Sequence, residues 1–193
     1  IQTLSSIVRV LKDLRQTKAL VYNKKILELD NNNLHALWNQ GFLLKKTDPP
    51  NTRDSIKFYE KYIEEESDPK DRKLFFAWGN LSVNHNELEN YSEAIKASDM
   101  ALQIIPDPYK QYLYPLYNKG IALEKQEKLP EAKACFVELA ALDHEKKEKK
   151  FDLGRLISIC KKLHDADDVK KYEKQLDDLN KDDDGDTAPP AYI

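Results

Sequence analysis

The chain has little of what most fold and function classes require. Its 193 residues include five glycines, two cysteines and one methionine. No apolar run approaches the roughly 20 residues of a membrane-spanning helix. There is no basic start followed by an apolar middle, the pattern of a secretory signal peptide. Alternating β-branched runs bounded by Asn-Gly or Asp-Gly are absent too, so the sequence predicts neither a bilayer span nor a sheet.

Sequence signatures of catalysis and of cofactor or metal binding are also missing. There is no glycine loop for phosphate, no GxSxG turn and no HExxH pair. A calcium loop begins at Asn180-x-Asp182-x-Asp184-Gly185, but its twelfth position holds Ala191 where a bidentate Glu is needed. We therefore expect no catalysis, no cofactor and no metal. The histidines are scattered along the chain: His35, His85, His144 and His164.

The two cysteines and the charge balance bear on compartment and partners. Cys135 and Cys160 lie in apolar patterns without CxxC spacing, which predicts buried thiols and favours a reducing compartment, the cytoplasm. A formal net charge of −3 with 34% charged residues gives no strongly basic face, so nucleic acid is not an expected partner. Because residue 1 is Ile and not Met, we expect the chain to be a fragment or a processed product.

Three stretches repeat one design, with their glycines 38 and 41 residues apart. In each, a glycine segment is followed by a segment built around a small residue, and we expect the two to pack closely as neighbouring helices. Such a unit cannot bury its apolar face alone, so it stacks on copies of itself. The glycine segments are Leu37-x-x-Gln40-Gly41, Phe75-x-x-Trp78-Gly79 and Leu116-x-x-Lys119-Gly120, and the small residues are Ser55, Ala94 and Ala132.

These motifs resemble the tetratricopeptide repeat, a helix-turn-helix of 34 residues. The unit from Leu116 has the family spacing, whereas the second unit has about three extra residues near Asn86 and the first about two near Asp48. The resemblance implies an all-α, right-handed solenoid of about five antiparallel helix pairs over residues 1–179. Residues 180–193 are acidic, contain Pro189 and Pro190, and are expected to be disordered.

Local signals predict several helix starts. Asp68-Pro69 and Asp107-Pro108 each combine an acceptor side chain with a proline suited to the first helical position. Asn90-x-x-Glu93 has the form of a capping box. Pro115 falls inside the helix that Pro108 should begin, so we expect a kink or a second start there.

In the family the first helix of each pair lines a concave groove, and the resemblance carries this to positions counted from each glycine. The groove is then rich in aromatic rings, which supply much of the affinity at interfaces. Its amides could hold a peptide backbone. The alternative is that these rings are core. The predicted partner-binding residues are Trp38, Asn39, Phe42, Lys73, Phe76, Asn80, Tyr114, Tyr117, Asn118, Ile121, Phe151 and Arg155.

Family members that grip the terminal carboxylate of chaperone tails use lysine, asparagine and arginine at these positions. Here Asn80 and Asn118 match, but Phe76 replaces the first lysine, and Glu148 and Asp152 replace the last basic pair. Two acids would repel a carboxylate, so a chaperone tail is not the expected ligand. An apolar ligand with some basic character fits this pattern better.

Three function classes follow. The favoured one is a non-catalytic scaffold that binds a protein or peptide in the groove. The second is a structural segment of a larger assembly or longer repeat protein, which leaves homo-oligomerisation open. The third is an accessory domain of an enzyme whose catalytic part lies elsewhere. Docking of the apolar end of the tail, Pro189 to Ile193, into a groove is a further hypothesis.

Overall fold

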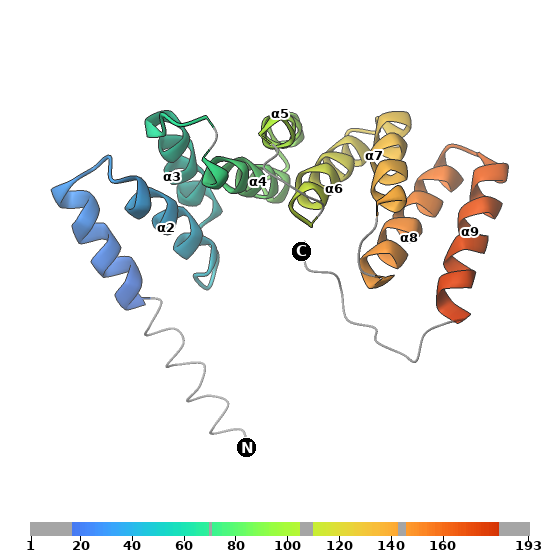
Figure 1. The fold of residues 1–193 in the computed structure, drawn as a ribbon, viewed down its shortest axis with the longest axis horizontal. Helices are drawn as coiled ribbons and strands as arrows, with labels where there is room; N and C mark the ends of the chain where they lie inside the picture. Colours follow the sequence, from blue (N-terminus) through green and yellow to red (C-terminus); the bar gives the residue numbers. More distant parts are fainter. Residues whose placement is uncertain (1–16, 70, 105–109, 143–145, 182–193) are drawn as a thin grey trace, which may run out of the picture.

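The protein is an open array of helices, as Figure 1 shows for the computed structural model, which describes residues 17–69, 71–104, 110–142 and 146–181. All regular secondary structure in these ranges is helical, so the all-α prediction is confirmed. The predictions made for Asp107-Pro108, the calcium-like loop after Lys181 and the tail lie outside the described residues. After a helix at residues 17–29 come α2 (Leu34–Lys45), α3 (Thr52–Glu65), α4 (Arg72–Glu87), α5 (Tyr91–Gln103), α6 (Lys110–Lys125), α7 (Leu129–Ala141), α8 (Lys146–Lys162) and α9 (Ala166–Lys181).

Successive helices pair as hairpins and stack along the array. α2 packs on α3, α4 on α5, α6 on α7 and α8 on α9, and each hairpin also contacts the next. The helix at residues 17–29 stands at one end, in the place of a second helix of a preceding pair. Four hairpins and this helix agree with the predicted solenoid of about five pairs.

Three of the hairpins close with the same turn. The backbone N–H of Asn90, Lys128 and Asp165 donates to a carbonyl five residues earlier, at 2.8, 2.9 and 3.0 Å. The residue before each donor has a left-handed conformation, with φ of 60° at Glu89, 60° at Glu127 and 57° at His164. This is the Schellman geometry, which satisfies the last carbonyls of the first helix. The repeat is therefore one of backbone geometry as well as sequence.

The predicted insertion in the second unit lengthens a helix and not a turn. α4 continues for eight residues past Gly79, to Glu87, whereas α6 continues for five past Gly120. Both then enter the same turn. The extra residues were expected in the inter-helix loop, but they add most of a helical turn to α4, because a three-residue Schellman turn leaves no room for them.

Two helix-start predictions need correction, and one is resolved. α4 begins at Arg72, where the Asp71 side chain accepts from the Lys73 N–H at 2.6 Å, so Asp68-Pro69 does not cap it. Asn90 does precede α5, but its side chain makes no capping bond. α6 runs through Pro115 as one continuous helix and does not start again there.

The motif glycines make room for aromatic rings. A Cβ on Gly41 would lie 3.0 Å from the Tyr59 ring, one on Gly120 would lie 2.9 Å from the Phe136 ring, and one on Gly79 would lie 3.3 Å from Tyr114. The expected small-residue contact holds in the first unit, where Ser55 Oγ donates to the Gly41 carbonyl at 2.8 Å. Gly154 holds the equivalent position in α8, three residues after Phe151 as Gly120 is three after Tyr117, but it has nothing within 4 Å of such a Cβ and makes room for no ring.

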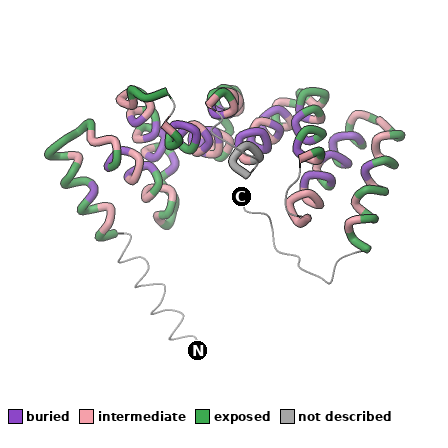
Figure 2. The backbone as a smooth tube through the Cα atoms, viewed as in Figure 1, coloured by how far each residue is buried: buried purple, intermediate pink, exposed green. Residues whose placement is uncertain are grey.

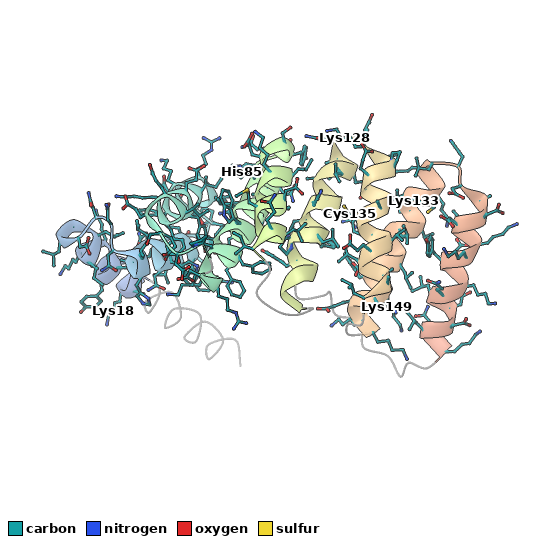
Figure 3. The ribbon with its side chains drawn as sticks, turned by 45° about the horizontal axis from the view of Figure 1, so that its top comes forward. Lys18, His85, Lys128, Lys133, Cys135 and Lys149 are labelled. Carbon is teal, nitrogen blue, oxygen red and sulfur yellow. The ribbon has the colours of Figure 1, made fainter. Side chains whose placement is uncertain are left out.

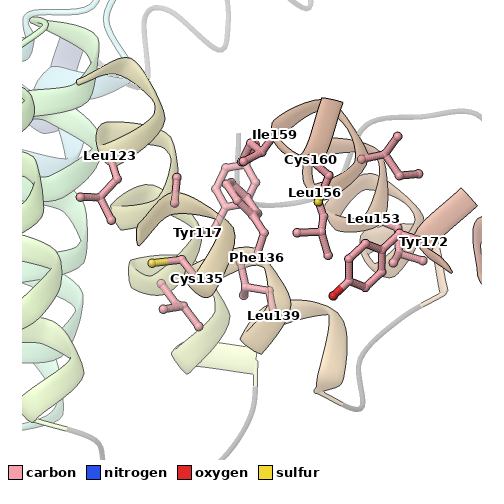
Figure 4. Close-up of a cluster of buried hydrophobic side chains, with 13 residues drawn as sticks. Tyr117, Leu123, Cys135, Phe136, Leu139, Leu153, Leu156, Ile159, Cys160 and Tyr172 are labelled. Atoms are coloured by element: carbon pink, nitrogen blue, oxygen red, sulfur yellow. The ribbon is translucent and has the colours of Figure 1, made fainter. Parts of the chain in front are cut away.

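The core runs along the middle of the array in two clusters. One spans α2 to α5 around Leu37, Tyr59 and Leu81, and the other spans α6 to α9 around Phe136 and Leu156. Figure 2 shows buried residues on the facing sides of the helices, and Figure 4 shows the second cluster.

Both cysteines lie in this second cluster as free thiols, which confirms the prediction of buried thiols. None of the described helices is long and apolar enough to cross a membrane.

Candidate functional site

Part of the predicted groove is assembled on the first helices of two hairpins, α2 and α4, around one tyrosine of α3. The ring of Tyr59 lies edge-on to Trp38, with centroids 6.5 Å apart, and its hydroxyl accepts from Asn80 Nδ2 at 3.1 Å. The missing side chain at Gly41 leaves the space for this ring. Tyr59 thus fixes a residue of α2 and a residue of α4 on either side of itself.

The outer part of this site is aromatic and exposed. Phe42 lies one turn beyond Trp38 and stacks on it at 5.8 Å with an interplanar angle of 9°. Phe76 lies one turn before Asn80, on the same helical face. Phe42 is 41% exposed and Phe76 is 37% exposed, while Trp38 and Asn80 are half-buried. Large apolar side chains of this exposure on one face are available to a partner.

Cations frame these rings. The ammonium of Lys46 lies 5.4 Å from the Phe42 centroid, and the guanidinium of Arg72 lies 6.0 Å from the Phe76 centroid. α2 and α4 carry no acidic residue before Glu87, whose carboxylate is taken by Lys45. We call the group Trp38, Phe42, Phe76, Lys46 and Arg72 the aromatic-basic patch.

Burial keeps the centre of the site uncharged. Tyr59 is 1% exposed, and loss of water around its hydroxyl raises its pKa well above the ordinary value. The phenol therefore stays protonated at any physiological pH and can accept from Asn80 while retaining a proton to donate. The only charges of the patch are the positive ones of Lys46 and Arg72.

The remaining predicted residues do not join this patch. Tyr117 is 4% exposed and Asn118 is 6% exposed, so the structure places both in the core. Tyr117 packs against Phe136 at 5.8 Å and Phe151 at 5.9 Å, and Asn118 Nδ2 donates to the Tyr114 carbonyl. The expected single trough through Trp38, Phe76 and Tyr117 is therefore not formed, because Tyr117 is sealed between hairpins.

The other predicted groove residues are neither fully buried nor part of the aromatic-basic patch. Ile121 and Phe151 are half-buried against the second core cluster. Arg155 is engaged internally: its Nη1 donates to Glu124 at 3.1 Å, and its guanidinium lies 5.9 Å from the Phe151 centroid. Asn39 and Tyr114 are half-buried, and Lys73 is exposed next to Arg72.

The geometry adds a second argument against a chaperone-tail clamp. Such a clamp needs two free asparagine amides, but Asn118 is buried and its amide is already bonded to a carbonyl. Asp152 is 0% exposed as well, so it does not present a negative charge to a ligand on this face. The expectation of a basic ligand depended on that charge and is revised below.

Sequence reasoning missed the cations of the patch. Lys46 is four residues after Phe42, and Arg72 is four residues before Phe76, so both share a helical face with a predicted groove residue. The signal was therefore present in the spacing. The counted positions ran from six residues before each glycine to one after it, so Lys46, five after Gly41, and Arg72, seven before Gly79, were not included.

No protein-family model and no curated protein sequence matches the chain. Solved structures do share its architecture. MamA from Desulfovibrio magneticus RS-1 (residue 41 to the end) superposes with a TM-score of 0.73 at 16% identity, covering 95% of each chain. A putative kinesin light chain from Podosopora anserina with nearly identical TPR-like repeats gives a TM-score of 0.68 at 8% identity, over 89% of this chain and 90% of that one. BtubC from P. vanneervenii gives 0.67 at 12% identity, over 91% and 75%. The chain therefore has the helical solenoid fold of tetratricopeptide-type repeats.

Proposed function

We propose that the protein is a non-catalytic scaffold that binds a segment of another protein on the aromatic-basic patch. The observation that carries this is the exposure of Phe42 and Phe76 on adjacent first helices, each with a cation beside its ring. Exposed rings on a rigid helical frame lose little conformational entropy on binding, because Trp38 and Tyr59 already hold the geometry. Solenoids present extended surfaces of this kind to their ligands.

The charge of the patch favours an acidic ligand. Lys46, Arg72 and the neighbouring Lys73 are all positive, and Glu87, the one acidic residue of α2 and α4, is paired with Lys45. A basic ligand, the earlier expectation, would meet like charges at this end of the array. A segment that alternates apolar and acidic side chains would place its rings or aliphatic groups on Phe42 and Phe76, and its carboxylates on the cations.

Binding can be followed through tryptophan, since the chain has only two, Trp38 in the patch and Trp78 outside it. We expect a blocked Asp-Leu-Asp-Phe-Asp peptide to shift the indole N–H NMR signal of Trp38 and leave that of Trp78 in place. The Trp38→Phe variant assigns the two signals. A peptide with Asn for each Asp should bind at least about fivefold more weakly, because it lacks the charge interactions, which are each worth up to about 1 kcal/mol.

A matched pair of variants tests the location. Phe76→Ala should weaken the peptide by about tenfold or more, since truncating an interface aromatic costs roughly 1–2 kcal/mol or above. Val137→Ala is the control, because Val137 on α7 is 38% exposed, close to the 37% of Phe76. Equal affinity for the two variants, with unchanged circular dichroism, would place the binding site elsewhere.

A second candidate function is assembly through the end of the array. On the helix at residues 17–29, Val21 is 50% exposed, Tyr22 66%, Ile26 43% and Leu29 91%. These residues recur at helical spacing and form an exposed apolar face at the end of the described part of the chain, which favours a structural role in a longer array or oligomer. Sedimentation of the Tyr22→Lys variant against the unmodified chain tests this. A monomer in both cases would exclude self-association through this face.

A further inference from the structure

A second hollow lies on the other side of α4. Trp78, Leu81 and His85 form its floor, Glu60 of α3 stands at one wall, and residues of α5 from Glu93 to Met100 form the other. Its volume is about 520 Å³. At 100° per residue, Trp78, Leu81 and His85 fall on the face of α4 roughly opposite Phe76 and Asn80. We call this hollow the α3–α5 cleft, and it is separate from the aromatic-basic patch.

The floor of the α3–α5 cleft is apolar. Trp78 is half-buried, Leu81 and Ala97 are buried, and Met100 is 38% exposed at the edge. The volume lies within the roughly 300–1,000 Å³ of sites that enclose ligands or large side chains. An exposed methionine beside a tryptophan gives a flexible apolar wall that can adapt to a guest.

The walls of the cleft are negative. Its acidic residues are Glu60, Glu93 and Asp99, and the cations beside them are Lys96 and Lys119, which leaves a net charge of −1. Glu93 is held by Lys96 at 2.7 Å and Asp99 by Lys119 at 2.6 Å. Among the ion pairs of the described residues, none involves Glu60, which is exposed.

His85 does not offset this negative charge at neutral pH. Burial lowers the pKa of its imidazole, although Glu60 and Glu93 pull in the opposite direction. Figure 3 labels His85 among the side chains drawn as sticks. The imidazole is therefore neutral near pH 7, and the cleft keeps a surplus of negative charge over an apolar floor.

We propose that the α3–α5 cleft is a second binding site, which receives an arginine side chain from a basic segment of a partner protein. A guanidinium is planar and weakly hydrated, so it can lie on the Trp78 indole while its N–H groups donate to the Glu60 carboxylate. The aliphatic part of the arginine covers Met100 and Leu81. With the aromatic-basic patch on the opposite face of α4, the protein joins an acidic segment and a basic one.

The indole of Trp78 reports on this site directly. A blocked Gly-Arg-Gly-Arg-Gly peptide should shift the Trp78 indole N–H signal and leave that of Trp38 unchanged. The same peptide with citrulline for arginine keeps the shape and removes the charge, and it should bind at least fivefold more weakly. Phe76→Ala, which disables the other site, should not change the affinity for the arginine peptide.

Two lysine substitutions separate specific binding from general charge attraction. Met100→Lys places a cation in the cleft and should weaken the arginine peptide at least tenfold. Val137→Lys adds the same charge to another second helix, α7, at a residue that is also 38% exposed, and should have little effect. Glu60→Gln should weaken binding about three- to fivefold.

Either of two results would overturn the proposal. One is a Trp78 signal that the arginine peptide does not move. The other is an equal loss with Met100→Lys and Val137→Lys, which would mean diffuse attraction to a negative protein. Failure here leaves the acidic-peptide result at Trp38 untouched, so the two sites are tested independently.

Discussion

Replacing a motif glycine by alanine should have opposite effects at two equivalent positions, Gly120 and Gly154. Both are inside long helices, α6 and α8, on the same half of the array. Gly154 is exposed with open space around its missing side chain, so Gly154→Ala gains helix propensity alone, about 0.5–1 kcal/mol of stability. Gly120→Ala gains the same propensity but drives a methyl group to 2.9 Å from the Phe136 ring.

The Phe136 ring cannot move aside cheaply. It is 0% exposed and packs edge-on to Tyr117 at 5.8 Å, and the Cys135 Cβ would lie 3.3 Å from the new methyl group. Overpacking of a filled core costs about 1–3 kcal/mol. The net effect of Gly120→Ala is then a loss of up to roughly 2.5 kcal/mol, with a central value of about 1.25 kcal/mol, against a gain for Gly154→Ala.

Urea unfolding followed by far-UV circular dichroism measures both values. At a slope of about 2.5 kcal/mol/M, a gain of about 0.75 kcal/mol raises the midpoint by about 0.3 M, and a loss of about 1.25 kcal/mol lowers it by about 0.5 M. Adding Phe136→Leu removes the ring edge, so Gly120→Ala should cost little in that background. If the Gly120→Ala and Gly154→Ala variants were equally stable, the conclusion that Gly120 leaves room for the Phe136 ring would be refuted.

Three further outcomes follow from the same structure. His164→Gly should stabilise the protein by about 0.5–1 kcal/mol in urea unfolding, since its φ of 57° is strained for a residue with a Cβ; a loss would contradict this. Burial raises the pKa of the Cys135 thiol to about 11 and raises that of Cys160, so neither should react with a thiol reagent at pH 8 until the protein unfolds. The Lys133 ammonium donates to Asp165 and lowers the pKa of that carboxyl below its ordinary 3.8. The pair therefore stabilises the folded protein above pH 4, and this contribution is lost on acidification. The thermal midpoints of Asp165→Asn and the unmodified chain should therefore differ at pH 7 and converge as the pH falls through the lowered pKa of Asp165; a constant difference would count against the ion pair.

Much of the fold follows from short-range patterns that can be recognised in the sequence. The glycine and small-residue spacing predicted stacked hairpins, and the structure has them at α2 to α9. The helix ends were less predictable. Asp68 and Asp71 are both plausible caps by residue type, and only the path of the chain selects Asp71.

The candidate site was predictable in part. Trp38, Phe42, Phe76 and Asn80 were placed by their register to the glycines. In the structure Trp38 and Asn80 contact Tyr59, Phe42 stacks on Trp38, and Phe76 is exposed on α4. The same register also selected Tyr117, which is buried. Register fixes the side of a helix on which a residue lies, but the depth of burial depends on how closely the next hairpin packs.

The sequence by itself determined that this chain is a stack of helical hairpins, because each segment carries an apolar face that only a copy of the segment can cover. It also determined which rings lie on the first helices. The tertiary structure alone decided which of those rings remain exposed. Phe136 and Phe151 pack against Tyr117 and bury it, whereas Phe42 and Phe76 each contact a ring of their own helix and stay exposed. That difference arises from contacts between residues distant in the chain, which no local pattern records.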